Sequence, residues 1–202
     1  MTHGNGRTTD FPIDPIFLER WSPRAFTREP ISEPDLLTIL EAARWAPSSF
    51  NAQPWRFIFA RRDTPDWENF LNLLLPNNRV WAKDASALVI LISNRFMRKP
   101  GEDVDVPSST HSFDAGTASG YLALQANKIG FFVHGMAGFD KERTLTELHI
   151  PKEFHAEAIY AIGKLGDPSK LPEALRAREH PSLRLPLTEL AFEGAFGRSF
   201  ES

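Results

Sequence analysis

The chain has 202 residues, of which 42% are hydrophobic and 24% charged, enough to bury a substantial core as one domain. Its formal net charge of −3 excludes the overall basic character that nucleic-acid-binding domains carry. The absence of cysteine excludes disulfides, thiol nucleophiles and cysteine-ligated metals.

The N-terminal residues are polar and lack the apolar run of a signal peptide, so residues 1–12 are expected to form a flexible tail. The longest apolar run, ALVILI at 87–92, is too short to span a bilayer. The histidines show no H-E-x-x-H or similar spacing, so no metal site is expected. We therefore expect a cytoplasmic protein that binds neither a membrane nor nucleic acid.

The first half of the chain predicts two helices followed by a strand. Pro15 suits the first turn of a short helix in DPIFLERW. The clearest helix follows Ser32, whose side chain can cap it, and it ends before Pro47. WRFIFA at 55–60 reads as a buried strand, and a further helix is expected over 63–75.

The second half continues the alternation. The run at 87–92 is apolar on both faces, which is typical of a buried strand. Residues 95–110 have no period, and together with His111 and Phe113 they are expected to form the lid of a pocket. The remaining predicted elements are a long helix over 113–130, strands over 131–136 and 156–166, and a short helix over 140–149.

Prolines at 168, 172, 181 and 186 interrupt the pattern of the C-terminal region, which is expected to be an irregular extension. No internal repeat or linker divides the chain, so residues 1–202 are expected to form a single domain. Alternating helices and strands indicate an α/β or α+β protein built around one sheet.

Three polar residues within one short stretch could bind a phosphate. Arg20, Ser22 and Arg24 lie in RWSPR, and a guanidinium group offers a planar fork of donors that matches phosphate oxygens. The alternative is a solvated basic turn at the end of a helix, and the triplet by itself favours this alternative.

A second polar stretch lies between two prolines. PSSFNAQP places Ser48, Ser49, Asn51 and Gln53 on a turn that Pro47 and Pro54 restrain. Such a turn could present hydroxyls and amides to a ligand. It could equally be an ordinary connection between a helix and a strand, and the stretch alone does not decide between the two.

Together these stretches resemble the nitroreductase family of FMN-dependent oxidoreductases. The resemblance rests on LERWSPRAF, EAARWAPSSFNAQPWRF and HGMAGFD, in this order, and it covers residues 15–166. It implies an α+β fold, an α-β-α sandwich with one central mixed sheet flanked by helices. It also implies an intertwined homodimer with FMN at the subunit interface, in which residues 168–202 embrace the partner subunit.

The resemblance assigns roles to individual residues. Ser48, Ser49 and Asn51 would approach the flavin from the partner subunit, and Gly138 would offer its backbone N–H to flavin N5. Asn78 would lie against the flavin pyrimidine. The phosphate and ribityl chain would be held by Arg20, Ser22 and Arg24, with Trp21 between them, and by Arg198 as the C-terminal basic residue.

Two positions depart from the family pattern. Trp81 stands where many members place a lysine against the flavin pyrimidine, and Ala137 stands where some members place a glutamate. Arg79 or Lys83 could replace the lysine. If neither does, the flavin should be harder to reduce, because the positive charge would stabilise the reduced flavin.

The implied activity is transfer of hydride from NADH or NADPH, through flavin N5, to a small electron-poor acceptor such as a nitroaromatic or a quinone. This ping-pong chemistry needs no dedicated acid or base, so no side chain is assigned a catalytic role. Two alternatives stay open. The same fold could perform other flavin chemistry, oxygen-dependent or dehalogenating, or the chain could be a non-catalytic flavin-binding or storage protein.

Overall fold

The computed structural model describes residues 5–200, and its centre is a four-stranded sheet in the order β1-β2-β6-β5. The central strand β2 is buried along its whole length except for its last residue, as its apolar sequence predicts. The strands are β1 (Trp55–Arg61), β2 (Ala87–Asn94), β5 (Phe132–Met136) and β6 (Phe154–Gly163).

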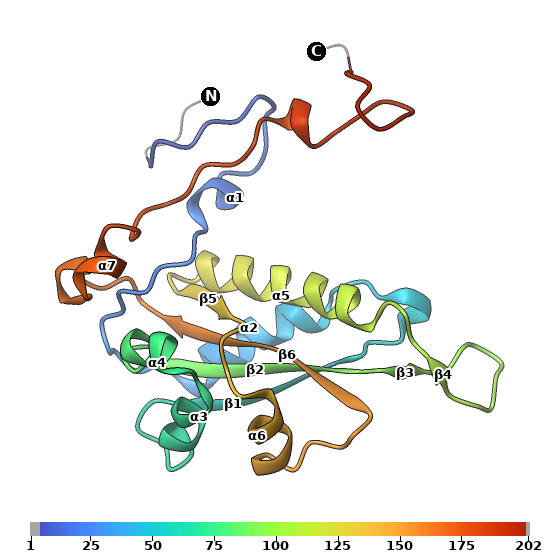
Figure 1. The fold of residues 1–202 in the computed structure, drawn as a ribbon, viewed down its shortest axis with the longest axis horizontal. Helices are drawn as coiled ribbons and strands as arrows, with labels where there is room; N and C mark the ends of the chain where they lie inside the picture. The colour runs from blue at the N-terminus through green and yellow to red at the C-terminus, as the bar shows by residue number, and fades with distance from the viewer. Residues whose placement is uncertain (1–4, 201–202) are drawn as a thin grey trace.

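Helices cover both faces of the sheet and form a three-layer α-β-α sandwich (Figure 1). One face is covered by α2 (Glu33–Arg44) and the long α5 (His111–Lys128). The other face is covered by α3 (Trp67–Leu73), α4 (Pro76–Ala82) and α6 (Lys141–Glu147). The α+β class and the sandwich are therefore confirmed.

The sheet differs from the expected mixed sheet, because all three neighbouring pairs of strands are antiparallel. Strands β2 and β5 run parallel to each other but are not neighbours, because β6 lies between them and runs opposite to both.

Helix α2 begins as its sequence predicts. The Ser32 side chain accepts a hydrogen bond from the backbone N–H of Asp35 at 3.1 Å, which caps the helix. Leu36, Ile39 and Ala43 are buried and face the sheet, in agreement with their helical spacing.

The helical region after β1 is shorter than predicted and is followed by a helix that was not predicted. Asp63 has a φ of 64°, and residues 63–66 form a turn, so α3 starts only at Trp67. Helix α4 is brief and begins with Pro76, with two residues between it and the end of α3. Its sequence, PNNRVWA, has two adjacent asparagines, which are poor helix formers, and this is why no helix was expected there.

The aperiodic segment 95–110 contains a small hairpin of β3 (Phe96–Met97) and β4 (Val106–Pro107). It projects from one end of the main sheet, beyond the N-terminal end of α5 (Figure 1). The main sheet and the hairpin together account for all strands longer than one residue within residues 5–200.

Both terminal regions leave the sandwich on the same side (Figure 1). The N-terminal region leads into α1 (Ile16–Glu19), and the C-terminal region carries α7 (Glu173–Arg176) and short 3₁₀ turns. Residues 1–4 of the predicted flexible tail lie outside the described residues. Arg7, in the same predicted tail, is buried.

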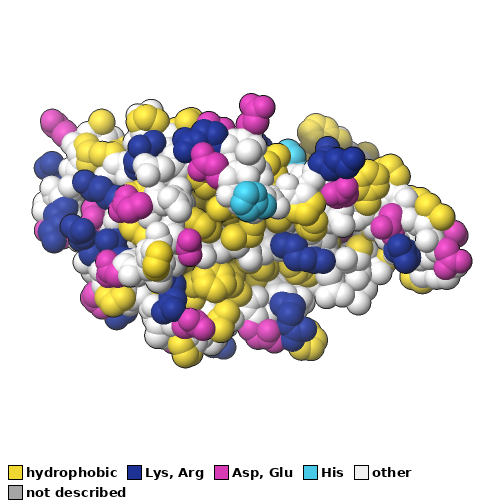
Figure 2. All heavy atoms as spheres, turned by 90° about the horizontal axis from the view of Figure 1, so that it is seen from below, with side chains coloured by type: hydrophobic (Ala, Val, Ile, Leu, Met, Phe, Trp, Pro, Cys, Tyr) yellow, Lys and Arg dark blue, Asp and Glu magenta, His cyan; other side chains and the backbone are white. Residues whose placement is uncertain are grey.

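Basic and acidic side chains intermingle on the face that carries α3 and α6 (Figure 2). This face has no continuous basic stripe of the kind that tracks a nucleic-acid backbone. Over residues 5–200, no helix combines the length and the apolar character needed to cross a membrane.

Candidate functional site

The structure brings the predicted phosphate-binding residues together around one cavity. Arg20, Trp21, Ser22 and Arg24 line a cavity of about 380 Å³ at the side of the molecule where the two terminal regions run. The other residues that line it are Arg7, His134, Arg178, His180, Ser182 and Arg184.

The backbone that carries these residues is extended and fixed to the end of the sheet. Phe26 forms an antiparallel bridge with Leu165, and Gly166 N–H donates to the Ala25 carbonyl at 2.8 Å. A Cβ atom at position 166 would lie 2.5 Å from the backbone of Phe26, so this close approach requires glycine. The Arg20–Arg24 segment therefore has a rigid base.

Glu179 attaches the C-terminal region to this segment. One of its carboxylate oxygens accepts the backbone N–H groups of Arg24 and Ala25 at 2.6 and 2.8 Å. Its side chain is fully buried, and its other oxygen lies 3.9 Å from the Arg24 guanidinium. This carboxylate therefore fixes both the backbone and the side chain of Arg24.

Arg7 attaches the N-terminal region in a similar way, which corrects the prediction of a flexible tail at this residue. Its guanidinium donates to the carbonyls of Leu18, Arg20 and Ser182 at 2.8, 2.7 and 3.0 Å. Three backbone acceptors hold a charged group that is only 6% exposed. A polar stretch without periodicity gave no sign of these contacts.

The cavity is strongly positive. Burial, and after it the neighbouring Arg184, lowers the pKa of Arg20. Burial also lowers the pKa of Arg24, and Arg178 adds to this while Glu179 opposes it. Like-charged groups held this close favour binding of an anion, because an anion relieves their repulsion.

His134 lies in the cavity wall as a neutral ring. Its Nδ1 atom is 3.0 Å from the Pro23 carbonyl, which fixes the proton on Nδ1. Burial, followed by the positive charge of Arg24, lowers the pKa of His134 from 6.5 to about 4. The ring packs on Trp81 at 4.6 Å between centroids, so packing and a backbone hydrogen bond account for this histidine.

Trp81 is a core residue that does not line the cavity but packs against His134, which does. It is 2% exposed, and the Arg24 guanidinium lies 6.0 Å from its ring. Neither suggested replacement for the missing lysine lines the cavity. Arg79 instead donates to Asn72 and to the Leu74 carbonyl, and Lys83 ends α4 as an exposed residue.

Asn78 and Gly138 lie in contact with each other. Asn78 Nδ2 donates to the Gly138 carbonyl at 3.0 Å, and the backbone N–H of Leu75 donates to the same carbonyl at 3.1 Å. The N–H of Gly138 has no acceptor among residues 5–200. Helix α4 thus fixes the Gly138 carbonyl, while the N–H of the same residue stays available to a ligand.

The polar turn at residues 48–51 does not line the same cavity. It packs at the start of α5, where the Ser49 N–H donates to the Asp114 carboxylate at 3.2 Å. Phe50 and Asn51 have φ angles of 51° and 53°, and Gln53 has 48°. Such left-handed conformations are costly for residues other than glycine, and they cluster where a loop has a functional role.

Arg198 is not brought to the cavity. Its guanidinium donates to the Glu193 carbonyl in the C-terminal loop. The arginines of the C-terminal region that do line the cavity are Arg178 and Arg184. All three arginines lie in a region without periodic elements, so the sequence alone could not show which of them reach the site.

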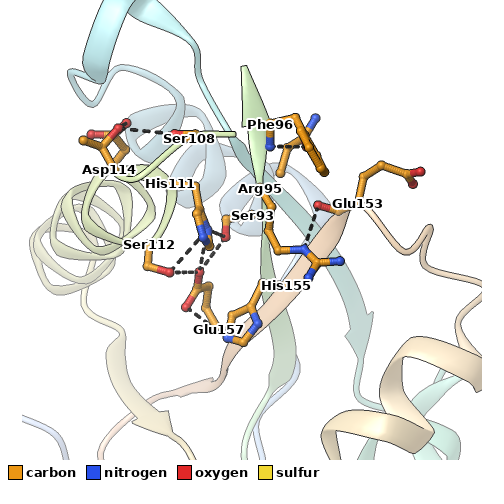
Figure 3. A network of polar contacts seen from close by, with 12 residues as sticks. Ser93, Arg95, Phe96, Ser108, His111, Ser112, Asp114, Glu153, His155 and Glu157 are labelled. Carbon is orange, nitrogen blue, oxygen red and sulfur yellow. Dashed lines mark hydrogen bonds and ion pairs between the residues drawn. The ribbon is translucent and has the colours of Figure 1, made fainter. Parts of the chain in front are cut away.

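A separate polar cluster connects β2, β6 and the start of α5 (Figure 3). The buried Ser93 hydroxyl donates to Glu157 at 2.5 Å and lies 2.8 Å from His111 Nδ1, while Ser112 donates to Glu157 at 2.7 Å. His155 Nε2 lies 3.9 Å from the same carboxylate. Sequence reasoning placed His111 near a lid but missed this cluster, because its members are far apart in the chain.

The fold and the cavity define an α+β protein with a positively charged, partly enclosed cavity. Comparison with known proteins gives the family. The model of the nitroreductase family matches residues 18–164, and the chain belongs to this family.

Individual relatives are similar over most of the chain. An FMN-containing oxidoreductase of known crystal structure is 49% identical, with a TM-score of 0.93 over 98% of this chain and 100% of that one. A 15.4 kDa protein of Mycolicibacterium smegmatis, named for the ask 5′ region, is 35% identical over 70% of this chain and 97% of its own length. An NADH dehydrogenase of Thermus thermophilus is 30% identical over 84% of this chain and 90% of its own length.

Proposed function

We propose that the protein binds FMN and transfers hydride from NADH or NADPH to small electron-poor acceptors such as nitroaromatics or quinones. The observation that carries this proposal is the positive cavity around Arg20, Ser22 and Arg24. The similarity to an FMN-containing oxidoreductase and to an NADH dehydrogenase supports the choice of cofactor and of electron donor.

The residues around the cavity fit the FMN phosphate. A monophosphate carries about −1.5 to −2 charges at neutral pH. Arg20 and Arg184 offer guanidinium donors to it, and the Ser22 hydroxyl adds a further hydrogen-bonding group. We assign the phosphate to these residues, and Arg184 takes the role first expected of Arg198.

The ring of the cofactor would extend from this phosphate towards α4 and the segment after β5. Trp81 links the two regions, since it contacts Arg24 and His134 and lies on the same helix as Asn78. The unpaired N–H of Gly138 would donate to flavin N5. Bound FMN supplies hydride transfer at this atom, and the protein positions it and excludes water.

A second copy of the chain would complete the site. Ser48, Ser49 and Asn51 lie outside the cavity of their own chain, so they would approach the flavin of the partner subunit. Helix α5 offers a surface for this dimer. Phe113 and Tyr121 are 78% and 41% exposed on it, and a Cβ atom at Gly116 or Gly120 would meet open space.

The C-terminal extension fits the same dimer. Residues 168–202 would embrace the partner subunit, since this region exposes several large apolar side chains. These are Leu183, Leu185, Leu187, Leu190 and Phe196, with exposed fractions from 38% to 94%. Apolar surface of this extent is expected to be covered in the assembled protein.

The proposal is tested by the visible spectrum of the purified protein, followed by anaerobic titration with NADH and with NADPH. We expect a yellow protein whose flavin absorbance bleaches with one or both nucleotides and returns when a quinone is added. A protein that takes up no FMN would overturn the proposal. A yellow protein that no nucleotide bleaches would instead support flavin storage.

A further inference from the structure

The cations of the cavity fall into two groups. Arg184 lies close enough to Arg20 and Arg7 to lower the pKa of both. Arg178 has the same effect on Arg24 and on His134. Arg20 and Arg24 stand at the two ends of one short segment, and Arg184 and Arg178 line the same cavity with them. We call Arg20 with Arg184 the Arg20 centre, and Arg24 with Arg178 the Arg24 centre.

The geometry of the chain holds Arg178 beside Arg24. Arg178 precedes Glu179, whose carboxylate is fixed to the Arg24 and Ala25 amides. Both arginine side chains line the cavity. Within residues 5–200 the Arg178 guanidinium has no hydrogen-bond or ion-pair partner, and the residue is exposed at the cavity, so its charge is available to a ligand.

The Arg24 centre lies on the side of the cavity that faces α4. Trp81 lies beneath Arg24 and packs against His134 at 4.6 Å. Trp81 belongs to the same helix as Asn78, which holds the Gly138 peptide. The Arg20 centre instead lies beside Arg7, which connects it to the two terminal regions.

We propose that Arg178 provides a second positive charge at the ring end of the flavin site and raises the reduction potential of the bound flavin. The inference rests on the proposed function. A reduced flavin carries negative charge along its N1–C2=O edge, and a cation placed there stabilises the reduced form more than the oxidised form. Trp81 and the neutral His134 cannot supply this charge, so Arg24 and Arg178 supply it together.

The test compares the Arg178→Gln variant with the wild type in its affinity for oxidised and for reduced FMN. The ratio compared is the dissociation constant of oxidised FMN divided by that of reduced FMN. We expect this ratio to fall about tenfold in the variant, because removal of one nearby positive charge weakens binding of the reduced form more. For a two-electron couple this equals a midpoint potential lower by about 30 mV. Arg178→Lys should restore most of the ratio, because it restores the charge.

Arg176→Gln is the matched control. It removes the same charge two residues away, from a side chain that does not line the cavity, and should leave the ratio unchanged. Riboflavin, which lacks the phosphate, distinguishes the two ends of the site. If Arg178 acts at the ring, Arg178→Gln should change the ratio for riboflavin as it does for FMN.

Three results would overturn the inference. An unchanged potential in Arg178→Gln would refute it while the proposed function stands. Equal weakening of both oxidation states of FMN, with no effect on riboflavin, would make Arg178 a phosphate ligand instead. A wild-type protein that binds no FMN would overturn the inference and the proposed function together.

Discussion

Replacement of His134 by asparagine should make the stability of the folded protein less sensitive to acid. His134 titrates at about pH 4 in the folded protein, below its ordinary value of 6.5, because it is buried next to Arg24. Between these two pH values the unfolded chain binds a proton that the folded chain does not. Acid therefore destabilises the folded state in this range, and the contribution is absent above pH 6.5.

The magnitude follows from the shift. A difference of this size between folded and unfolded pKa corresponds to about 3 kcal/mol once the pH has fallen to the folded value. Asparagine does not titrate in this range, and its side-chain amide can still donate to the Pro23 carbonyl that Nδ1 contacts. The variant should therefore lose about 3 kcal/mol less stability than the wild type between neutral pH and pH 4.

Urea unfolding of the flavin-stripped protein at several pH values measures this. The difference between the two proteins at each pH isolates His134, because all other titrating groups are common to both. The variant should be the less stable protein near neutral pH, where the loss of packing against Trp81 dominates, and the gap should close in acid. Parallel pH profiles for the two proteins would refute the buried, neutral state assigned to His134.

Three other substitutions test the site and its support. Arg184→Gln should weaken FMN binding about 10- to 100-fold, as loss of a charge-assisted hydrogen bond does, and leave riboflavin binding unchanged. Arg198→Gln should leave the binding of both ligands unchanged, and equal effects of the two substitutions in fluorescence titrations would restore Arg198 to the site. Gly138→Ala would place a Cβ 2.7 Å from Asn78 Nδ2 and displace the backbone around residue 138, so oxidised FMN should bind at least about tenfold more weakly. Unchanged binding would show that the backbone at residue 138 does not contact the flavin. Glu157→Ala should lower the free energy of unfolding in urea by about 1 to 3 kcal/mol, because the buried Ser93 hydroxyl loses an acceptor. The control Glu147→Ala, at an exposed ion pair, should lower it by at most about 0.5 kcal/mol, and similar losses in the two variants would contradict the account of this cluster.

Regular patterns made most of the fold predictable. The cap at Ser32, the apolar run of β2 and the period of α5 are local sequence patterns, and the folded chain forms the elements that they predict. Helix α4 and the β3–β4 hairpin lack such a pattern, because α4 carries two adjacent asparagines and the hairpin pairs only two residues on each strand. The antiparallel order of the sheet depends on where β6 returns, which no local pattern specifies.

The site was predictable where its residues are adjacent in the sequence. Arg20, Ser22 and Arg24 face one cavity because they share one extended segment. Arg178 and Arg184 reach the same cavity only because the C-terminal region folds back and is fixed by Glu179. A contact of this kind joins residues more than 150 positions apart, and composition and spacing carry no information about it.

The crystal structure of the protein with bound FMN tests the central claim most directly. We predict the phosphate within hydrogen-bonding distance of Arg20 and Arg184, and the ring edge beside the Gly138 N–H. We also predict that Ser48, Ser49 and Asn51 of a second subunit contact the same cofactor. An FMN held by a single chain, or one whose phosphate lies outside the arginine-lined cavity, would contradict the account.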